Sequence, residues 1–311
     1  MPMPILLAAL LAAAPAVPVP LTLAVDAYPS LSPDGATLLF QSNRGGRWAL
    51  YFADADGRNP RVFLDSGDDP SVASWSPDGA RIVFAATVGE APEIFVIDRD
   101  GSNRRRLTDD PGGDSHPHWS PDGTRIYFNS ARGTPDRSAE WSRQWHDVYS
   151  VALDGSALRR HTRCEAVCTY PAPSPDGKRL AYRKVVAAPA FDWGLRATER
   201  NSEVFVANLD GSDARNLSRH AAYDGWPRWS PDGRWVVVSS NRTGRPNAGQ
   251  LFALAADGDA VLQLTDGAEA FVQHSIAGPD AILAARVVDS VDPPFEHGHI
   301  VRLEVQWPPP E

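Results

Sequence analysis

One tetrapeptide, Ser-Pro-Asp-Gly, recurs along this 311-residue chain. Its five intact copies occupy residues 32–35, 76–79, 120–123, 174–177 and 230–233. A degenerate sixth copy, Gly278-Pro279-Asp280-Ala281, follows at a similar interval. The Asp residues of successive copies are 44 to 56 residues apart. A period of this size, with strand-like sequence between the copies, is typical of a radially repeated all-β array. The positions where the copies differ are therefore where function should be sought.

Each repeat contains four short β-rich runs. In the second repeat these runs are 81–85, 93–98, 106–108 and 116–119. Four such strands joined by turns form one antiparallel blade of a propeller. The six repeats thus predict an all-β fold, a six-bladed β-propeller of four-stranded antiparallel blades over residues 21–311. The sixth repeat has no run for an outer strand, so we expect residues 21–25 to complete that blade and close the ring.

The repeated turn has a physical reason. Pro sets φ at the second turn position and Gly takes the left-handed conformation at the fourth, which is a hairpin connection. The Asp of each copy is accordingly interpreted as a turn former and not as a catalytic acid. The residue before each turn is expected to pack between neighbouring blades; these residues are Leu31, Trp75, Trp119, Pro173, Trp229 and Ala277.

The first twenty residues predict a secretory signal peptide. An apolar run from Ile5 to Ala14 precedes a small-residue cleavage pattern near Ala16. The run is too short for a membrane span, so we expect no transmembrane segment in the mature chain and a periplasmic or secreted location. In such an oxidising compartment Cys164 and Cys168 predict a local disulfide. Half of a zinc site is the alternative interpretation of this cysteine pair.

The insertions predict two unlike faces. The turn face carries the Ser-Pro-Asp-Gly turns, and the loop face carries the connections from second to third strands. Long connections on the loop face span 130–146, 183–202, 241–249 and 288–299. A scaffold with one elaborated face is expected to carry its site there. The candidate ligand-binding residues are those expected on this face: Tyr28, His116, Trp141, Trp145, Tyr170, Trp193, Arg196, Trp226 and His274.

Two hypotheses compete for this cluster. In the first, aromatic and polar side chains bind a ligand by stacking and charge-assisted hydrogen bonds. In the second, a divalent metal activates water or a substrate oxygen. The ligands for that metal would come from His116, His274, His297, His299, Asp114 and Asp224. The sequence contains no Gly-X-Ser-X-Gly nucleophile elbow, so nucleophilic hydrolase chemistry has no support in it.

The repeat resembles that of a known family. Residues 75–108, 119–162 and 229–265 resemble the WD40-like repeat of the TolB propeller family. TolB proteins also have an N-terminal α/β domain and act with Pal and the Tol complex; we expect this chain to lack that domain. Related propellers precede the catalytic domain of prolyl-oligopeptidase-type enzymes. Others are oligogalacturonate lyases with a histidine-rich, metal-binding mouth.

The sequence therefore favours a binding module over an enzyme. We expect an exported, monomeric TolB-like propeller that binds a protein, peptide or glycan of the cell envelope and requires no cofactor. The net charge of −9 argues against a nucleic-acid partner, which needs a basic patch. The alternative is a metal-dependent polysaccharide lyase or hydrolase with a histidine-lined site at the tunnel mouth.

Overall fold

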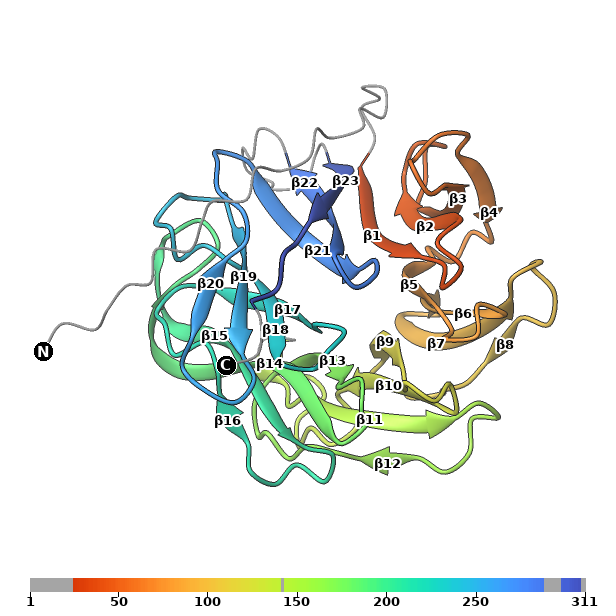
Figure 1. The fold of residues 1–311 in the computed structure, drawn as a ribbon. Coiled ribbons are helices and arrows are strands. Elements are labelled where there is room, and N and C mark those ends of the chain that lie inside the picture. The colour runs from red at the N-terminus through yellow and green to blue at the C-terminus, as the bar shows by residue number, and fades with distance from the viewer. Residues whose placement is uncertain (1–24, 141–142, 288–297, 309–311) are drawn as a thin grey trace, which may run out of the picture.

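Six β-sheets surround a central axis, and each sheet is one blade of a propeller (Figure 1). The computed structural model describes residues 25–140, 143–287 and 298–308. Five blades have four antiparallel strands each, and the sixth has three strands among the described residues. No described segment forms a helix of the length and apolar character needed to cross a bilayer. The predicted all-β, six-bladed propeller is confirmed.

The strands follow one another in chain order within each blade. Blade 1 contains β1 (Asp26–Leu31), β2 (Thr37–Ser42), β3 (Ala49–Asp54) and β4 (Arg61–Leu64). Blade 2 contains β5 (Ser71–Trp75), β6 (Arg81–Val88), β7 (Ala91–Asp98) and β8 (Arg105–Arg106). Blade 3 contains β9 (Asp114–Trp119), β10 (Arg125–Ser130), β11 (Asp147–Ala152) and β12 (Arg159–Arg160).

The second half of the ring repeats this order. Blade 4 contains β13 (Cys168–Pro173), β14 (Arg179–Phe191), β15 (Ala197–Asn208) and β16 (Arg215–Asn216). Blade 5 contains β17 (Asp224–Trp229), β18 (Trp235–Ser240), β19 (Gln250–Ala255) and β20 (Val261–Gln263). Blade 6 contains β21 (Ala270–Ile276), β22 (Ala281–Val287) and β23 (Gly298–Glu304). The innermost strand of every blade therefore comes first in the chain.

The Ser-Pro-Asp-Gly turns connect the first and second strands of their blades. In the first turn the Asp34 carboxylate accepts hydrogen bonds from the Ser32 hydroxyl and the Ala36 backbone N–H, and Gly35 has φ +72°. The hydroxyl and backbone bonds lower the pKa of Asp34 to about 2. The same pair of bonds recurs at Asp78. These carboxylates are occupied in holding the turn, as expected of turn formers.

Large side chains before the turns pack between blades. Trp75 is buried in one cluster with Leu39 and Leu50 of blade 1 and Phe84 of its own blade. The indole N–H of Trp229 donates to the Ala172 carbonyl of blade 4 at 2.8 Å. A buried aromatic with a satisfied N–H gives both apolar contact and a fixed orientation. The predicted role of these tryptophans in blade packing is confirmed.

The ring closes between blades 6 and 1. Val25, immediately before the inner strand of blade 1, forms a parallel bridge with Gly298 of β23. Val167, immediately before the inner strand of blade 4, bridges His146 beside the third strand of blade 3 in the same way. Blades 6 and 1 are therefore joined like an ordinary pair of neighbours. Residues 21–24 lie outside the described residues, so their role as an outer strand stays a prediction.

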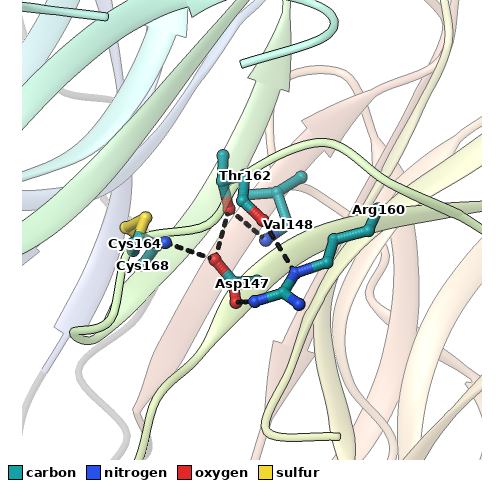
Figure 2. Close-up of a disulfide and its surroundings, with 6 residues drawn as sticks. All are labelled: Asp147, Val148, Arg160, Thr162, Cys164 and Cys168. Carbon is teal, nitrogen blue, oxygen red and sulfur yellow. Dashed lines mark hydrogen bonds and ion pairs between the residues drawn. A yellow bond between two sulfur atoms is a disulfide. The ribbon is translucent and has the colours of Figure 1, made fainter. Parts of the chain in front are cut away.

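The predicted disulfide between Cys164 and Cys168 is present, with the two Cα atoms 6.3 Å apart (Figure 2). It lies on the crossing from blade 3 to blade 4. The Asp147 carboxylate accepts the Cys164 backbone N–H at 2.8 Å and the Thr162 hydroxyl at 2.9 Å, and it pairs with Arg160 at 2.6 Å. The crossing segment is thus linked to the start of β13 by the disulfide and to β11 by the hydrogen bonds and ion pair of Asp147.

Candidate functional site

Six residues with left-handed backbone surround the axis. In every blade the register of the innermost strand shifts at a β-bulge. One residue at each bulge has φ between 49° and 55°. These residues form what we call the bulge ring: Tyr28, Val72, His116, Tyr170, Trp226 and Gln273. Bulges re-aim side chains, and such strained positions cluster at functional sites. Five of the six lie three residues before the residue that the sequence predicts to pack between blades.

Blade 6 departs from this spacing, which would place His274, three residues before Ala277, in the bulge ring. In blade 6 Ile276 pairs with Ile282, whereas in blade 2 Trp75 pairs with Ile82. The degenerate turn of blade 6 is therefore one residue shorter, which moves the repeat register by one. Gln273 consequently occupies the bulge ring, and His274 is buried with Nε2 3.2 Å from the Val237 carbonyl.

Aromatic side chains pack on the bulge ring from the loop face. The rings of His116 and Tyr170 have centroids 3.9 Å apart, and those of Tyr170 and Trp226 are 5.8 Å apart. Trp193 packs edge-on against Trp226 at 6.0 Å and against Tyr223 at 5.4 Å. Edge-to-face contacts at these distances stabilise aromatic pairs. This aromatic cap covers the bulge ring at blades 3 to 5, whereas Tyr28 and Gln273 on the other side line a smaller cavity of about 200 Å³.

Trp193 reaches the cap because the 183–202 insertion is a β-hairpin and not an open loop. Strands β14 and β15 stay paired as far as Phe191 and Ala197. The hairpin tip lies against blade 5, since the Trp193 carbonyl accepts the Asn247 backbone N–H and the Asn241 side-chain amide, both at 3.1 Å. A side chain at Gly249 would collide with the indole, because its Cβ would lie 1.9 Å from a ring carbon. The tip is thus fixed over the axis.

The other predicted loop-face residues lie away from the bulge ring. Trp145 is half-buried at the end of the β10–β11 connection, and its backbone N–H donates to the Thr134 hydroxyl at 3.0 Å. Arg196 is exposed at the hairpin tip, with its Nε 2.7 Å from the Asp192 carboxylate. Phe191, on the same hairpin, is 47% exposed. Trp141 lies outside the described residues.

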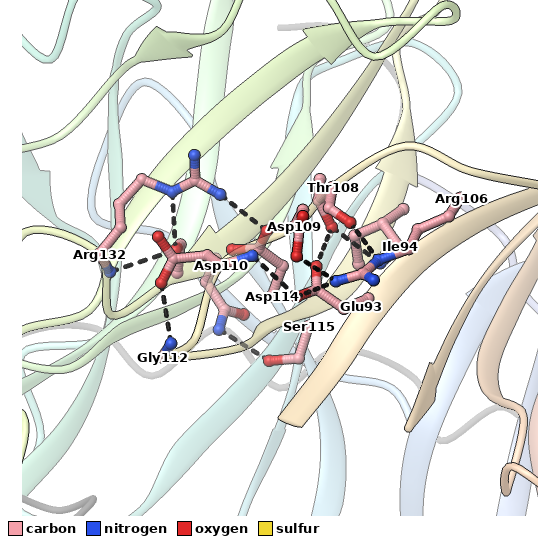
Figure 3. Close-up of polar contacts among 12 residues, drawn as sticks. Glu93, Ile94, Arg106, Thr108, Asp109, Asp110, Gly112, Asp114, Ser115 and Arg132 are labelled. Atoms are coloured by element: carbon pink, nitrogen blue, oxygen red, sulfur yellow. Dashed lines mark hydrogen bonds and ion pairs between the residues drawn. The ribbon is translucent and has the colours of Figure 1, made fainter. Parts of the chain in front are cut away.

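The acidic residues of the metal hypothesis are bound to arginines (Figure 3). Asp114 is 2.7 Å from Arg132 and Asp224 is 2.7 Å from Arg242, and both carboxylates are fully buried. Asp26 pairs with Arg44 in the same way, and in all three pairs the arginine follows 18 residues after the acid. The recurrence at equivalent blade positions identifies a structural motif.

The described histidines of the metal hypothesis lie on three different strands, and two of them form hydrogen bonds with other groups. His116 Nδ1 lies 2.8 Å from the Asn129 side-chain oxygen, and burial lowers the pKa of His116 to about 4. His299 belongs to β23, opposite Arg286 of β22. Among the described residues no group of three or more His, Cys, Asp or Glu is placed to hold a metal ion. His297 lies outside the described residues.

A large cavity occupies the other end of the tunnel. It has a volume of about 590 Å³ and extends from Tyr28 to the six exposed prolines that begin the turns, which are Pro33, Pro77, Pro121, Pro175, Pro231 and Pro279. One residue from each blade, two positions after the bulge ring, lines its middle. This middle ring consists of Ser30, Ser74, His118, Ala172, Arg228 and Ser275. The open end of the tunnel is therefore on the turn face, where the sequence predicted no site.

Two side chains give this cavity its chemistry. Arg228 is half-buried, and desolvation lowers its pKa to about 10. His118 Nδ1 lies 2.8 Å from the Trp119 carbonyl, and burial and then the nearby Arg228 charge lower the pKa of His118 to about 4. Sequence reasoning missed this pair because it searched only the loop face. Comparing the six repeats two positions after the bulge would have found it, since no other repeat has a basic residue there.

Part of this chain is similar in sequence to known propeller proteins. Residues 65–191 match the family model of the TolB beta propeller domain. The TolB homolog of Chlorobium luteolum is 30% identical over 138 residues, which are 35% of this chain and 31% of that protein. Over these residues the chain is similar to TolB propellers. The protein Atu1656 of Agrobacterium fabrum is 29% identical over 123 residues, 39% of this chain and 37% of that relative. The matches thus span about a third of the length of these curated relatives.

Solved structures share the fold of this TolB-like propeller. TolB from Acinetobacter baumannii matches with a TM-score of 0.60 and 24% identity, over 78% of this chain and 54% of that one. An oligogalacturonate lyase in complex with manganese matches with a TM-score of 0.58 and 16% identity, over 84% of this chain and 71% of that one. A puromycin hydrolase matches with a TM-score of 0.59 and 20% identity, over 84% of this chain and 43% of that one. One fold supports several activities, so the function has to be inferred from the residues of the site.

Proposed function

We propose that this TolB-like propeller is an exported binding module that holds a protein, peptide or glycan of the cell envelope on its loop face, without catalysis. The observation that carries the proposal is the β14–β15 hairpin, which is anchored at its tip and presents an exposed aromatic. Phe191 is 47% exposed on a strand whose next turn is fixed by Trp193. A pre-organised hydrophobic anchor loses little conformational entropy on binding.

Two exposed arginines lie on the same hairpin as this anchor. Arg196 and Arg200 are exposed on the same hairpin, and Ala187 pairs with Arg200 across the strands. Exposed aromatics beside arginines are typical of interfaces that combine stacking with charge-assisted hydrogen bonds. These groups suit a ligand that has an apolar or sugar face and an anionic group.

The same geometry weighs against the metal-dependent lyase or hydrolase. Asp114 and Asp224 would have to leave their arginines to bind a metal, which would leave two buried guanidinium groups without counter-charges. Breaking a buried pair in this way is strongly unfavourable. The similarity to the manganese-containing lyase concerns the fold alone.

The test compares two double variants. In the first, Phe191→Ala and Arg200→Ala remove the hairpin anchor; in the second, Val62→Ala and Leu158→Ala remove exposed apolar groups from outer-edge segments of blades 1 and 3. Binding is measured on an oligosaccharide array and to purified envelope proteins. We expect affinity to fall at least tenfold in the first variant and to stay unchanged in the second.

Two results would overturn the proposal. One is equal binding by both double variants, which would move the site away from the hairpin. The other is a stoichiometric divalent metal in tag-free protein together with cleavage of a polysaccharide, which would favour the enzyme.

A further inference from the structure

The turn-face cavity contains a half-buried cation, Arg228, and the described residues give it no ion pair. Arg228 donates from Nη1 to the carbonyl of its own neighbour, Pro227, at 2.8 Å. The groups that act on its charge are the hydroxyls of Tyr28 and Tyr170. None of the described residues that line the cavity is an Asp or Glu. The guanidinium therefore retains most of its hydrogen-bonding capacity unused.

Three other partly buried arginines of this fold each form an ion pair with an aspartate. Arg44, Arg132 and Arg242 have side chains that are 16%, 18% and 10% exposed, and each is 2.7 Å from an Asp carboxylate. Burying a charge without a partner is costly. The inner strand of blade 5 nonetheless places Arg228 at a position where four other blades have Ser or Ala and blade 3 has His118. An external anion would supply the missing counter-charge.

The walls of the cavity define the rest of the ligand. Its lining residues include Trp75, Trp119 and Trp229, Leu31 and Ile276, and the six turn prolines. A volume of about 590 Å³ lies in the range of pockets for small organic ligands. Apolar walls around one guanidinium suit an anionic head on an apolar body.

His118 adds a second polar contact. Its Nδ1 lies 2.8 Å from the Trp119 carbonyl, so in the neutral ring this nitrogen carries the proton. Nε2 is then a hydrogen-bond acceptor in the same middle ring as Arg228. A ligand with a hydroxyl or N–H near its carboxylate can donate to it.

We propose that the turn-face cavity is a second binding site, separate from the loop face, that takes a small carboxylate with an apolar body. Arg228 binds the carboxylate, the tryptophan and proline walls enclose the apolar body, and His118 accepts a hydrogen bond from a neighbouring donor group. The site is independent of the function proposed for the loop face.

The probes are matched pairs that differ in charge. Benzoate is compared with benzamide and hexanoate with hexanamide, and inorganic phosphate serves as an anion without an apolar body. Salicylate, which has a hydroxyl beside its carboxylate, tests the contact with His118. Titration calorimetry and the fluorescence of the three cavity tryptophans report binding. We expect both carboxylates to bind, both amides to bind at least tenfold more weakly, and salicylate to bind more tightly than benzoate.

The variants distinguish an effect of the Arg228 charge on binding from an effect of the substitution on folding. Arg228→Met is expected to weaken carboxylate binding at least tenfold and, by removing an unpaired, half-buried charge, to raise Tm. Arg159→Gln makes the same change of charge at an exposed outer-strand position and should bind like the wild type. Arg228→Lys keeps the charge and should retain part of the affinity, which provides the comparison if Arg228→Met fails to fold. The double variant of Phe191 and Arg200 should keep carboxylate binding, since it alters only the loop face.

Several results would overturn the proposal. Equal binding of acids and amides would show an apolar pocket only. Carboxylate binding that survives in Arg228→Met would place the anion elsewhere. Phosphate binding as tightly as benzoate would contradict the role of the apolar walls, and absence of binding by every carboxylate at 10 mM would rule out the site.

Discussion

Stability should fall steeply between pH 7 and pH 5, because desolvation favours the neutral form of three histidines. Burial lowers the pKa of His116 and His118 to about 4 and that of His274 to about 3. In the unfolded chain each titrates near its ordinary pKa of about 6.5. Below that pH these histidines are protonated in the unfolded chain but stay neutral in the folded protein, so acid favours unfolding. The stability is fully present above about 6.5 and is lost as pH falls toward 4.

The magnitude follows from the size of these shifts. At pH 5 the unfolded pKa lies about 1.5 units above the solution pH, which corresponds to about 2 kcal/mol for each histidine at 1.36 kcal/mol per unit. Three such groups give an upper bound of about 6 kcal/mol. Carboxylates in the repeated turns, such as Asp34 with a pKa of about 2, lose their contribution only below about pH 4. Burial also lowers the pKa of His161 and His220, which adds to the loss, and raises the pKa of Asp114, Asp224 and Glu203, which opposes it.

The assay is urea denaturation at several pH values between 5 and 7, for the wild type and His274→Gln. Glutamine can replace the hydrogen bond to the Val237 carbonyl and does not titrate. The difference in unfolding free energy between the two proteins should shift by about 2 kcal/mol across this range, while contributions from all other groups cancel. If the two stability profiles run parallel, His274 is not buried in the neutral form and the reasoning fails.

Three further predictions concern the structural devices of the ring. Asp224→Asn should lower the unfolding free energy by about 3–5 kcal/mol because it leaves a buried arginine without a counter-charge; urea denaturation measures it, and a loss below 1 kcal/mol would contradict it. Gly249→Ala should displace Trp193 and increase acrylamide quenching of tryptophan fluorescence; unchanged quenching would mean that the cap tolerates the methyl group. Replacing both Cys164 and Cys168 by Ser should cost about 2 kcal/mol through loss of a small closed loop, whereas a larger loss would show that the crossing segment depends on the bond.

The aromatic cap illustrates a contact that periodicity does not predict. The spacing of the repeats indicates that Tyr170 and Trp226 lie at equivalent blade positions, because each precedes its packing residue by three. It does not indicate that Trp193 joins them, since Trp193 lies at the tip of an insertion with no counterpart in the other blades. Its place is fixed by hydrogen bonds to Asn241 and Asn247 of blade 5. Such contacts between insertions depend on three-dimensional proximity and leave no period in the sequence.

The sequence by itself determined the number of blades, the turn face, the role of the turn Asp residues and the disulfide, because each depends on local spacing or on residues close in the chain. Only the tertiary structure decided which end of the tunnel is open. Trp193 packs over Trp226 at the loop-face end, and the turn-face end holds the larger cavity with Arg228. Asp114 and Asp224 likewise became structural residues only when their arginine partners were located. The physical reason is that burial and counter-charge are properties of the folded surroundings of a residue, which the repeat places in space but does not specify.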